Sequence, residues 1–364
     1  AQSALILINK LLEQFDVHVL VTSGTVTSAQ LLEKRLPNKA MHQFMPLDQP
    51  KWCKRFLNYW KPDAALWIES ELWPNMLRLT KKKKTPIILI NARLSDVSFR
   101  RWSFFKSAAE KILKNFKLVL TQTERDQSRF EKLGAKKVIV TGNIKHSAAP
   151  LPYDESDLSE LENALKNRSV WVYASTHDGE EELAARIHKK LKTDLPDLLT
   201  IIIPRHPERR EDIKRKLNDD ELDIGFRGDD KLQPNAETDI YIADTLGELG
   251  LFYHLSDIAL IGRSFSHDGG GGHNPIEAAQ LDCAVLTGPN IQFQQDLFND
   301  MIADNAITRV TSEEELQKEL HMLLTSKETR EQQKKNAMKY AQKQTGIIDG
   351  VMEKIDPLLR KALK

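Results

Sequence analysis

The chain has 364 residues, of which 40% are hydrophobic and 29% charged, and it carries a formal net charge of +1. This length exceeds what one hydrophobic core usually supports, so we expect two domains. The two cysteines, Cys53 and Cys283, cannot form a disulfide framework. The sequence contains no run of about 18 apolar residues, the length that a helix needs to cross a membrane.

The chain opens inside a helical pattern. Apolar residues recur at helical spacing from Leu5 to Phe15, and no Met precedes them. Because a domain rarely begins in this way, we expect that a natural N-terminal segment is absent from this chain.

Short apolar segments typical of buried strands alternate with helical patterns along the first half. The expected strands are 17–23, 64–70, 86–92, 118–123 and 137–143, and the helical patterns include 102–116 and 124–133. This alternation predicts a parallel sheet covered by helices. Residues 146–157 then contain two prolines and are typical of a hinge or linker.

The second half repeats this alternation. The expected strands are 169–175, 198–206, 239–244, 257–263 and 283–289, and the helices are 179–191, 207–217, 246–255, 275–281, 313–342 and 347–362. We therefore predict an α/β protein with two Rossmann-like domains facing a cleft, residues 1–148 and 149–342. Residues 343–364 form a C-terminal helix that can pack back toward the N-terminal domain. Ligands of such sheets bind outside the carboxyl ends of the strands.

Charge is distributed unevenly between the two halves. Residues 1–150 carry 26 Lys and Arg against 12 Asp and Glu, a net charge of +14, whereas the remainder carries 27 against 40, a net charge of −13. The basic half indicates an anionic partner, which could be a nucleic acid, a phosphorylated substrate or a membrane surface.

The loop after 169–175 offers a helix start. Ser175 or Thr176 is able to cap the next helix, whose free N–H groups would then form an anion site. Glu180 and Glu181 in the first turn merely suit the helix dipole in this interpretation.

Two further loops carry residues suited to an anionic ligand. Arg205 follows a strand and precedes a helix, where its guanidinium could bind a phosphate or carboxylate. Gly247 permits close backbone approach at another helix start. Each of these residues could also be an ordinary surface or capping residue.

The fourth loop contains four consecutive glycines before Asn274, Pro275 and Glu277. The segment 274–277 is either a capping box or a grip on a ligand. A capping box needs no glycines, so we expect that the glycines clear space for a ligand to approach the backbone.

Three histidines, His177, His206 and His273, lie in three of these loops. They could converge as metal ligands, but neither a histidine pair at i, i+4 nor a cysteine partner supports this. We therefore expect a hydrogen-bonding or core role for the histidines, no metal and no cofactor.

Motifs in both halves resemble those of one family, the 3-deoxy-D-manno-octulosonic acid (Kdo) transferases. These bacterial glycosyltransferases of the GT-B type move Kdo from CMP-Kdo to lipid A precursors. The motifs are ESELWPN (69–75), INARLSDVS (90–98), TGNIKH (141–146), ASTHDGEE (174–181), PRHPER (204–209), DTLGELG (244–250) and GGHNPIEAA (271–279).

The resemblance implies that CMP-Kdo binds the loops of the second half. Arg205 would face the phosphate, Asn274 would lie near it, and Glu277 would hold the ribose hydroxyls. The implied donor residues are Ser175, Thr176, Arg205, His206, Leu246, Gly247, Glu248, Gly271, Gly272, His273, Asn274 and Glu277. Arg263 replaces a small residue of the family pattern, and it could serve the Kdo carboxylate or an acceptor phosphate.

The resemblance also assigns the first half to the lipid A precursor. The implied acceptor residues are Glu69, Glu71, Asn91, Arg93 and Lys145, although Glu71 could instead cap the segment 72–75. The basic surface would then meet an anionic membrane at the cytoplasmic face of the bacterial inner membrane. Its expected members are Lys81–Lys84, Arg100, Arg101 and Lys106, with Trp52, Trp60, Trp73, Phe99 and Trp102.

The family's general base is a Glu in a Ser-x-Gly-Glu loop, which this sequence lacks. We expect that Glu upstream of Ala1, so the catalytic residues are unknown, and this chain by itself would bind donor but transfer sugar poorly. The alternatives are a nucleotide-sugar epimerase of the same fold, a donor-binding but inactive form, and a nucleic-acid-binding protein, although no nucleic-acid module is recognisable.

Overall fold

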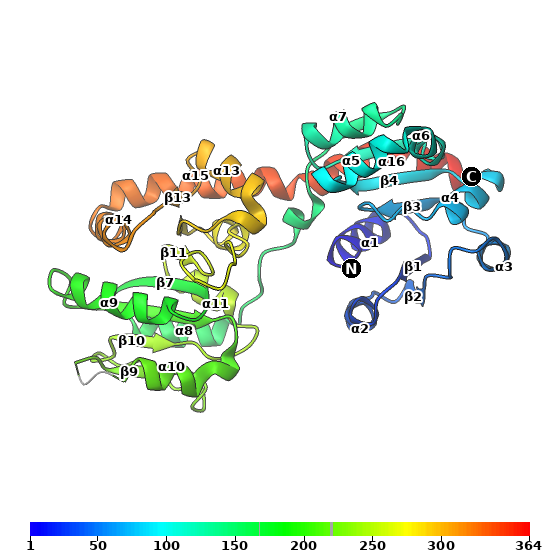
Figure 1. The fold of residues 1–364 in the computed structure, drawn as a ribbon. Coiled ribbons are helices and arrows are strands. Elements are labelled where there is room, and N and C mark those ends of the chain that lie inside the picture. Colours follow the sequence, from blue (N-terminus) through cyan, green and yellow to red (C-terminus); the bar gives the residue numbers. More distant parts are fainter. Residues whose placement is uncertain (167, 219–220) are drawn as a thin grey trace. The chain divides into compact units, whose positions relative to one another are not determined.

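The computed structural model describes residues 1–166, 168–218 and 221–364 (Figure 1). The chain divides into two compact units, residues 1–148 together with 344–364, and residues 149–343. All strand pairs in both units are parallel within the described residues, which confirms the predicted α/β class.

The first unit contains a four-stranded sheet of order β3-β4-β5-β6 and a separate pair, β1-β2. Its elements are α1 (Gln2–Gln14), β1 (Val19–Ser23), α2 (Val26–Arg35), β2 (Ala40–Phe44), α3 (Pro50–Trp60), β3 (Ala65–Ile68), α4 (Pro74–Lys82), β4 (Ile87–Ala92), α5 (Asp96–Phe104), α6 (Lys106–Leu113), β5 (Leu118–Thr121), α7 (Glu124–Lys132), β6 (Val138–Val140), η1 (Ile144–Ser147) and α16 (Ile347–Ala362).

Residues 87–90 of β4 form a continuous apolar run because helices cover both faces of its sheet. Ile87 and Leu89 pack in the core beneath α4, α6 and α7, whereas Ile88 and Ile90 pack in the core shared with α1 and α16. In Figure 1 the C-terminal helix α16, drawn in red, accordingly lies against this unit.

The second unit contains a seven-stranded sheet of order β13-β12-β11-β7-β8-β10-β9. Its elements are α8 (Glu155–Ala164), β7 (Ser169–Thr176), α9 (Glu180–Lys192), β8 (Leu198–Pro204), η2 (Pro207–Arg209), α10 (Arg210–Lys216), β9 (Ile224–Phe226), β10 (Ile240–Ile242), α11 (Leu249–Leu255), β11 (Ile258–Ile261), α12 (Ile276–Gln280), β12 (Ala284–Thr287), η3 (Gln292–Gln294), α13 (Gln295–Ala303), β13 (Thr308–Arg309), α14 (Glu313–Thr325) and α15 (Lys327–Thr345).

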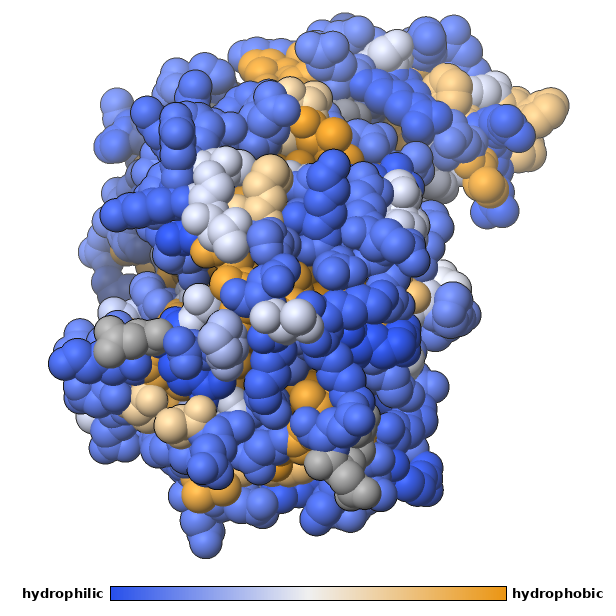
Figure 2. Space-filling view, turned by 90° about the vertical axis from the view of Figure 1, so that its left-hand side faces the viewer, coloured by the Kyte–Doolittle hydropathy of each residue, from blue (hydrophilic) through white to orange (hydrophobic). Residues whose placement is uncertain are grey.

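The central strand β7 also divides its side chains between two cores. Trp171 and Tyr173 pack beneath α9 and α14, whereas Val172 and Ala174 pack on the side of α8 and α11. The face drawn in Figure 2 is largely hydrophilic, with apolar residues in small separate groups.

Several boundaries differ from those expected. The predicted helix 102–116 divides at Phe105 into α5 and α6, and the predicted helix 313–342 divides at Ser326, whose backbone is extended. Among the described residues, no helix is both long and apolar enough to cross a bilayer.

Candidate functional site

The candidate donor site lies at one edge of the second sheet. Strands β11, β7, β8 and β10 are consecutive neighbours and parallel, so their carboxyl ends meet at the same edge. The predicted donor residues lie at the end of β7, in the loops that follow β8, β10 and β11, and in the first turn of α12.

Two residues at this edge other than glycine have backbone in the left-handed region. Ser175 has φ +62° and Arg263 has φ +61°. Gly262, the residue before Arg263, packs closely against Ser175, because a Cβ added to it would stand 2.3 Å from the carbonyl oxygen of Ser175. Strained backbone of this kind costs about 1 to 3 kcal/mol and clusters at functional sites.

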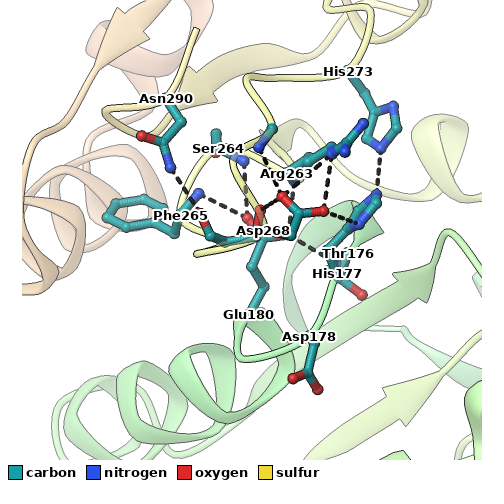
Figure 3. Close-up of polar contacts among 12 residues, drawn as sticks. Thr176, His177, Asp178, Glu180, Arg263, Ser264, Phe265, Asp268, His273 and Asn290 are labelled. Carbon is teal, nitrogen blue, oxygen red and sulfur yellow. Dashed lines mark hydrogen bonds and ion pairs between the residues drawn. The ribbon is translucent and has the colours of Figure 1, made fainter. Parts of the chain in front are cut away.

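The carboxylate of Glu180 joins the loops after β7 and β11 (Figure 3). It accepts hydrogen bonds from the backbone N–H groups of His177 at 2.9 Å, Arg263 at 2.7 Å, Ser264 at 2.9 Å and Phe265 at 2.8 Å. The side chain is fully buried, and burial raises its pKa although the N–H donors oppose that shift.

The prediction that Ser175 or Thr176 caps α9 is wrong. The helix begins after Gly179, and neither Ser175 nor Thr176 caps it. The N–H of His177 already binds the Glu180 carboxylate, so this loop holds an internal anion where we expected an external one.

Glu181 is also more than a partner of the helix dipole. It is buried, accepts a hydrogen bond from the Thr176 hydroxyl at 2.8 Å and pairs with Arg209 at 2.9 Å. The interpretation of Glu180 and Glu181 as simple first-turn residues is wrong, because both tie α9 to neighbouring loops.

The three histidines do come together. Nε2 of His177 lies 2.9 Å from Nε2 of His273, and the rings of His177 and His206 are 5.8 Å apart. Nδ1 of His177 lies 3.1 Å from the Asp268 carboxylate. Within the described part of the chain, no group of three or more His, Cys, Asp or Glu side chains has the arrangement of a metal site.

Arg205 and His206 are exposed at the end of β8. The backbone N–H of Arg205 donates to the carbonyl of Thr176 at 3.0 Å, which fixes its loop against β7. The charge of Arg205 acts on two other predicted donor residues. It adds to burial, which lowers the pKa of His273, and it opposes burial, which raises the pKa of Glu277.

Asn274 and Glu277 contact each other before and within α12. The amide of Asn274 donates to the Glu277 carboxylate at 3.1 Å, and its oxygen accepts the N–H of Ile276 at 3.2 Å. In a capping box Glu277 would instead accept from the backbone N–H of Asn274. Burial raises the pKa of Glu277, and Asn274 and Arg205 oppose this rise.

The glycines before Asn274 pack mainly against the protein's own chain. A Cβ on Gly270 would stand 2.0 Å from Arg263, one on Gly271 2.3 Å from the backbone N of Gln292, and one on Gly272 2.6 Å from Phe298. Packing of the protein's own chain is therefore enough to require glycine at these three positions, and the approach of a ligand to this backbone stays a prediction. Only Gly269 among the four has open space beside it.

Gly247 and Glu248, in the loop after β10, line part of a hollow of about 320 Å³, together with Lys231 and residues from 152–157. Leu246 is 83% exposed, and Gly247 has φ +90°. The carboxylate of Glu248 accepts two hydrogen bonds from Arg227, at 2.7 and 2.8 Å. No motif pointed to Arg227, which is fully buried.

Three of the five predicted acceptor residues gather at the carboxyl edge of the first unit's sheet. Glu69 pairs with Lys145 at 2.8 Å, and the Asn91 side chain accepts the N–H of Ile144, the residue before Lys145, at 3.1 Å. Glu69 and Asn91 have φ values of +63° and +57°. Burial raises the pKa of Glu69, but Lys145 and other donors reverse this into a net lowering.

The other two predicted acceptor residues, Arg93 and Glu71, make fewer contacts with this group. Arg93 is exposed, and its charge contributes to lowering the pKa of Glu69. Glu71 is exposed and does not cap the segment 72–75. Asp48 does so instead, accepting the N–H groups of Asn75 at 3.1 Å and Met76 at 2.8 Å.

Comparison with known proteins connects this geometry to a family. The family model described as 3-deoxy-D-manno-octulosonic-acid transferase (kdotransferase) matches residues 1–148. A 3-deoxy-D-manno-octulosonic acid transferase of Rickettsia felis is 36% identical over 99% of this chain and 77% of its own length. A transferase of the same name from Haemophilus influenzae is 29% identical over 93% of this chain and 80% of its own length.

A solved structure adds information about the fold. The UDP-GlcNAc 2-epimerase of Neisseria meningitidis bound to UDP-GlcNAc aligns with a TM-score of 0.62 and 16% identity, over 99% of this chain and 96% of that one. At this identity the likeness concerns the fold alone. The sequence matches to the transferases extend over nearly the whole chain and agree with the motifs, so this chain belongs to the Kdo transferase family of glycosyltransferases.

Proposed function

We propose that the protein transfers Kdo from CMP-Kdo to a hydroxyl of a lipid A precursor, with inversion and release of CMP, in lipopolysaccharide biosynthesis. The observation that carries the proposal is the convergence of the donor motifs on one sheet edge in a member of this family. The epimerase alternative is not favoured, because an epimerase resembles this chain in fold at only 16% identity.

The chemistry of the second unit suits a nucleotide. Glu277 is a half-buried carboxylate that could accept hydrogen bonds from two vicinal ribose hydroxyls. Arg205 is exposed and makes no side-chain hydrogen bond to the described residues, so its guanidinium is available to a phosphate. Cationic and neutral groups here would stabilise CMP, whose charge grows as the glycosidic bond breaks.

The first unit is proposed to hold the acceptor. The paired Glu69 and Lys145 present a carboxylate and an ammonium group, both partly exposed, beside Asn91. Together with Arg93 and Glu71 they offer donors and acceptors for the hydroxyl and phosphate groups of a lipid A precursor.

We assign the basic surface of this unit to an anionic membrane at the cytoplasmic face of the inner membrane. Phe104 and Phe105 are 89% and 65% exposed, and Arg100, Arg101 and Lys106 are exposed beside them. Each Lys or Arg near such a surface contributes about 1 kcal/mol to binding, and exposed aromatic rings suit the interface.

Isothermal titration of the protein with CMP and with UDP tests the donor assignment. We expect CMP to bind and UDP to bind at least about tenfold more weakly, because one missing hydrogen bond to the base changes affinity by about 1.4 kcal/mol. Selective binding of UDP would contradict the proposal and favour an epimerase.

A further inference from the structure

Asp268, His177 and His273 form a continuous chain of hydrogen-bonding side chains in the second unit (Figure 3). Oδ2 of Asp268 lies 3.1 Å from Nδ1 of His177, and Nε2 of His177 lies 2.9 Å from Nε2 of His273. The two imidazole rings are 5.1 Å apart and inclined by 30°.

The partners dictate where the protons lie. A carboxylate only accepts hydrogen bonds, so Nδ1 of His177 carries a proton toward Asp268. Neutral His177 then offers a lone pair at Nε2, which requires a proton on Nε2 of His273. The remaining nitrogen, Nδ1 of His273, is therefore an acceptor, and it makes no hydrogen bond to residues 1–166, 168–218 or 221–364.

One added proton changes Nδ1 of His273 from a hydrogen-bond acceptor into a hydrogen-bond donor. The proton enters at Nδ1 of His273, and the proton already on its Nε2 passes to Nε2 of His177. His177 becomes an imidazolium beside Asp268, while His273 stays neutral and now presents an N–H at Nδ1. No other bond is made or broken.

The surrounding charges favour holding the added charge on His177. Burial lowers the pKa of His273 to about 4, with help from His177, Arg205 and Arg263, and only Asp268 opposes this. His177 is also lowered in pKa by burial, and by Arg263 and His206, but Asp268 lies in direct contact with it.

Asp268 itself stays ionised. Burial alone would raise its pKa, but the N–H of Gly270, the Ser266 hydroxyl, and the charges of Arg263 and His177 bring that pKa down to about 2. The chain therefore ends in a permanent negative charge at ordinary pH.

We propose that the hydrogen-bonded side chains of Asp268, His177 and His273 form a protonation-dependent contact for the nucleotide phosphate. Uptake of one proton turns Nδ1 of His273 from a hydrogen-bond acceptor into an N–H donor. The inference rests on the proposed function, because it assumes that a nucleotide phosphate occupies the loop of His273. Nucleotide binding then takes up a proton, and affinity rises as the pH falls.

Nitrogen-15 NMR of the imidazole rings tests the chain without any ligand. At pH 8 the free protein should contain His177 protonated at Nδ1 and His273 protonated at Nε2. The opposite tautomers in either ring would overturn the inference.

Titration with CMP between pH 8 and pH 6 tests the coupling. The association constant of the wild type should rise by about tenfold more than that of Asp268→Asn, since one linked proton changes affinity by at most tenfold per pH unit. His177→Gln breaks the chain at its middle and should lose the same increment. Ionisation of CMP itself is common to all proteins and cancels in this comparison.

His321→Gln is the matched control, because His321 is a partly exposed histidine that lies 3.5 Å from Asp194 on another part of the unit. This variant should keep the pH dependence of the wild type, and circular dichroism checks that all variants are folded. Equal pH dependence in wild type and Asp268→Asn would overturn the inference and leave the proposed function intact. Failure of the wild type to bind CMP would contradict the proposed function. The NMR result would then be the test of the hydrogen-bonded arrangement of Asp268, His177 and His273.

Discussion

Glu277 is the single residue at which a ligand role and a fold role can best be separated. Its carboxylate touches Asn274 and is half-buried at the start of α12. Glu277→Ala should weaken CMP binding by about tenfold to a hundredfold, the value of a hydrogen bond to a charged group, while changing the free energy of unfolding by less than about 1 kcal/mol. Calorimetry and urea denaturation measure the two effects.

Glu314→Ala is the control, because Glu314 is an exposed first-turn glutamate of α14. It should leave CMP affinity unchanged. If Glu277→Ala instead lost stability and kept its affinity for CMP, the carboxylate would serve α12 and not the nucleotide.

Sequence motifs located the candidate loops, but they could not reveal which side chains are already paired with other groups of the folded protein. Glu180 was indistinguishable in the sequence from any first-turn glutamate. Its burial depends on the loop after β11, whose N–H groups reach it only in the folded unit. Arg227 was missed for the same reason, since its partners Glu248 and Asp157 lie far away in the sequence.

At the level of elements, Glu180 joins the start of α9 to the loop after β11. Glu180→Gln should lower the free energy of unfolding by about 2 to 4 kcal/mol, because an amide cannot satisfy N–H groups that now converge on a carboxylate. Glu211→Gln, an exposed glutamate in the first turn of α10, should change stability by less than about 0.5 kcal/mol. Equal stability of the two variants would show that the Glu180 carboxylate does not hold the loops together.

His188 joins α9 to β8 and makes the second unit sensitive to acid. It is fully buried, hydrogen-bonds the Thr200 hydroxyl at 2.9 Å, and has a pKa lowered by burial to about 4. The unfolded chain protonates this histidine near pH 6.5, whereas the folded protein protonates it only near pH 4. The free energy of unfolding is therefore highest above about pH 6.5 and decreases as the pH falls toward 4.

The expected loss is about 3 kcal/mol between pH 6.5 and pH 4, measured by chemical denaturation of the wild type against His188→Gln. Glutamine does not titrate, so the difference between the two proteins isolates the histidine. Parallel pH profiles would contradict the assignment of a depressed pKa to His188.

Most strands could be predicted from their apolar runs because both faces of the four-stranded and seven-stranded sheets are covered. β2 was missed, since it belongs to a separate two-stranded pair and its side chains are partly or fully exposed. β13 was missed because it has only two residues, and β9 because its three residues, Ile-Gly-Phe, include a glycine that interrupts the apolar run. The break at Ser326 was hidden within a continuous helical composition.

At the scale of the whole molecule, the uneven charge of the sequence distinguishes the two units. The proposed membrane surface predicts that Arg100→Glu with Arg101→Glu will weaken binding to vesicles containing anionic lipid by at least about tenfold. Replacing Phe104 and Phe105 by Ser should weaken binding further, even at high salt, where charge attraction is screened. Vesicle sedimentation measures both effects.

Lys214→Glu with Lys335→Glu is the matched control, because these two lysines are exposed on α10 and α15 of the second unit. This pair should bind vesicles as the wild type does. Equal losses in both double variants would mean that total charge, and not the surface around α5, drives binding.

The central claim is transfer of Kdo, and mass spectrometry of the lipid tests it most directly. The protein in its full natural length is incubated with CMP-Kdo and a tetra-acylated lipid A precursor. We predict that the lipid gains one or more Kdo residues and that an equal amount of CMP appears. Binding of CMP-Kdo with an unchanged lipid, or release of free Kdo alone, would contradict the account.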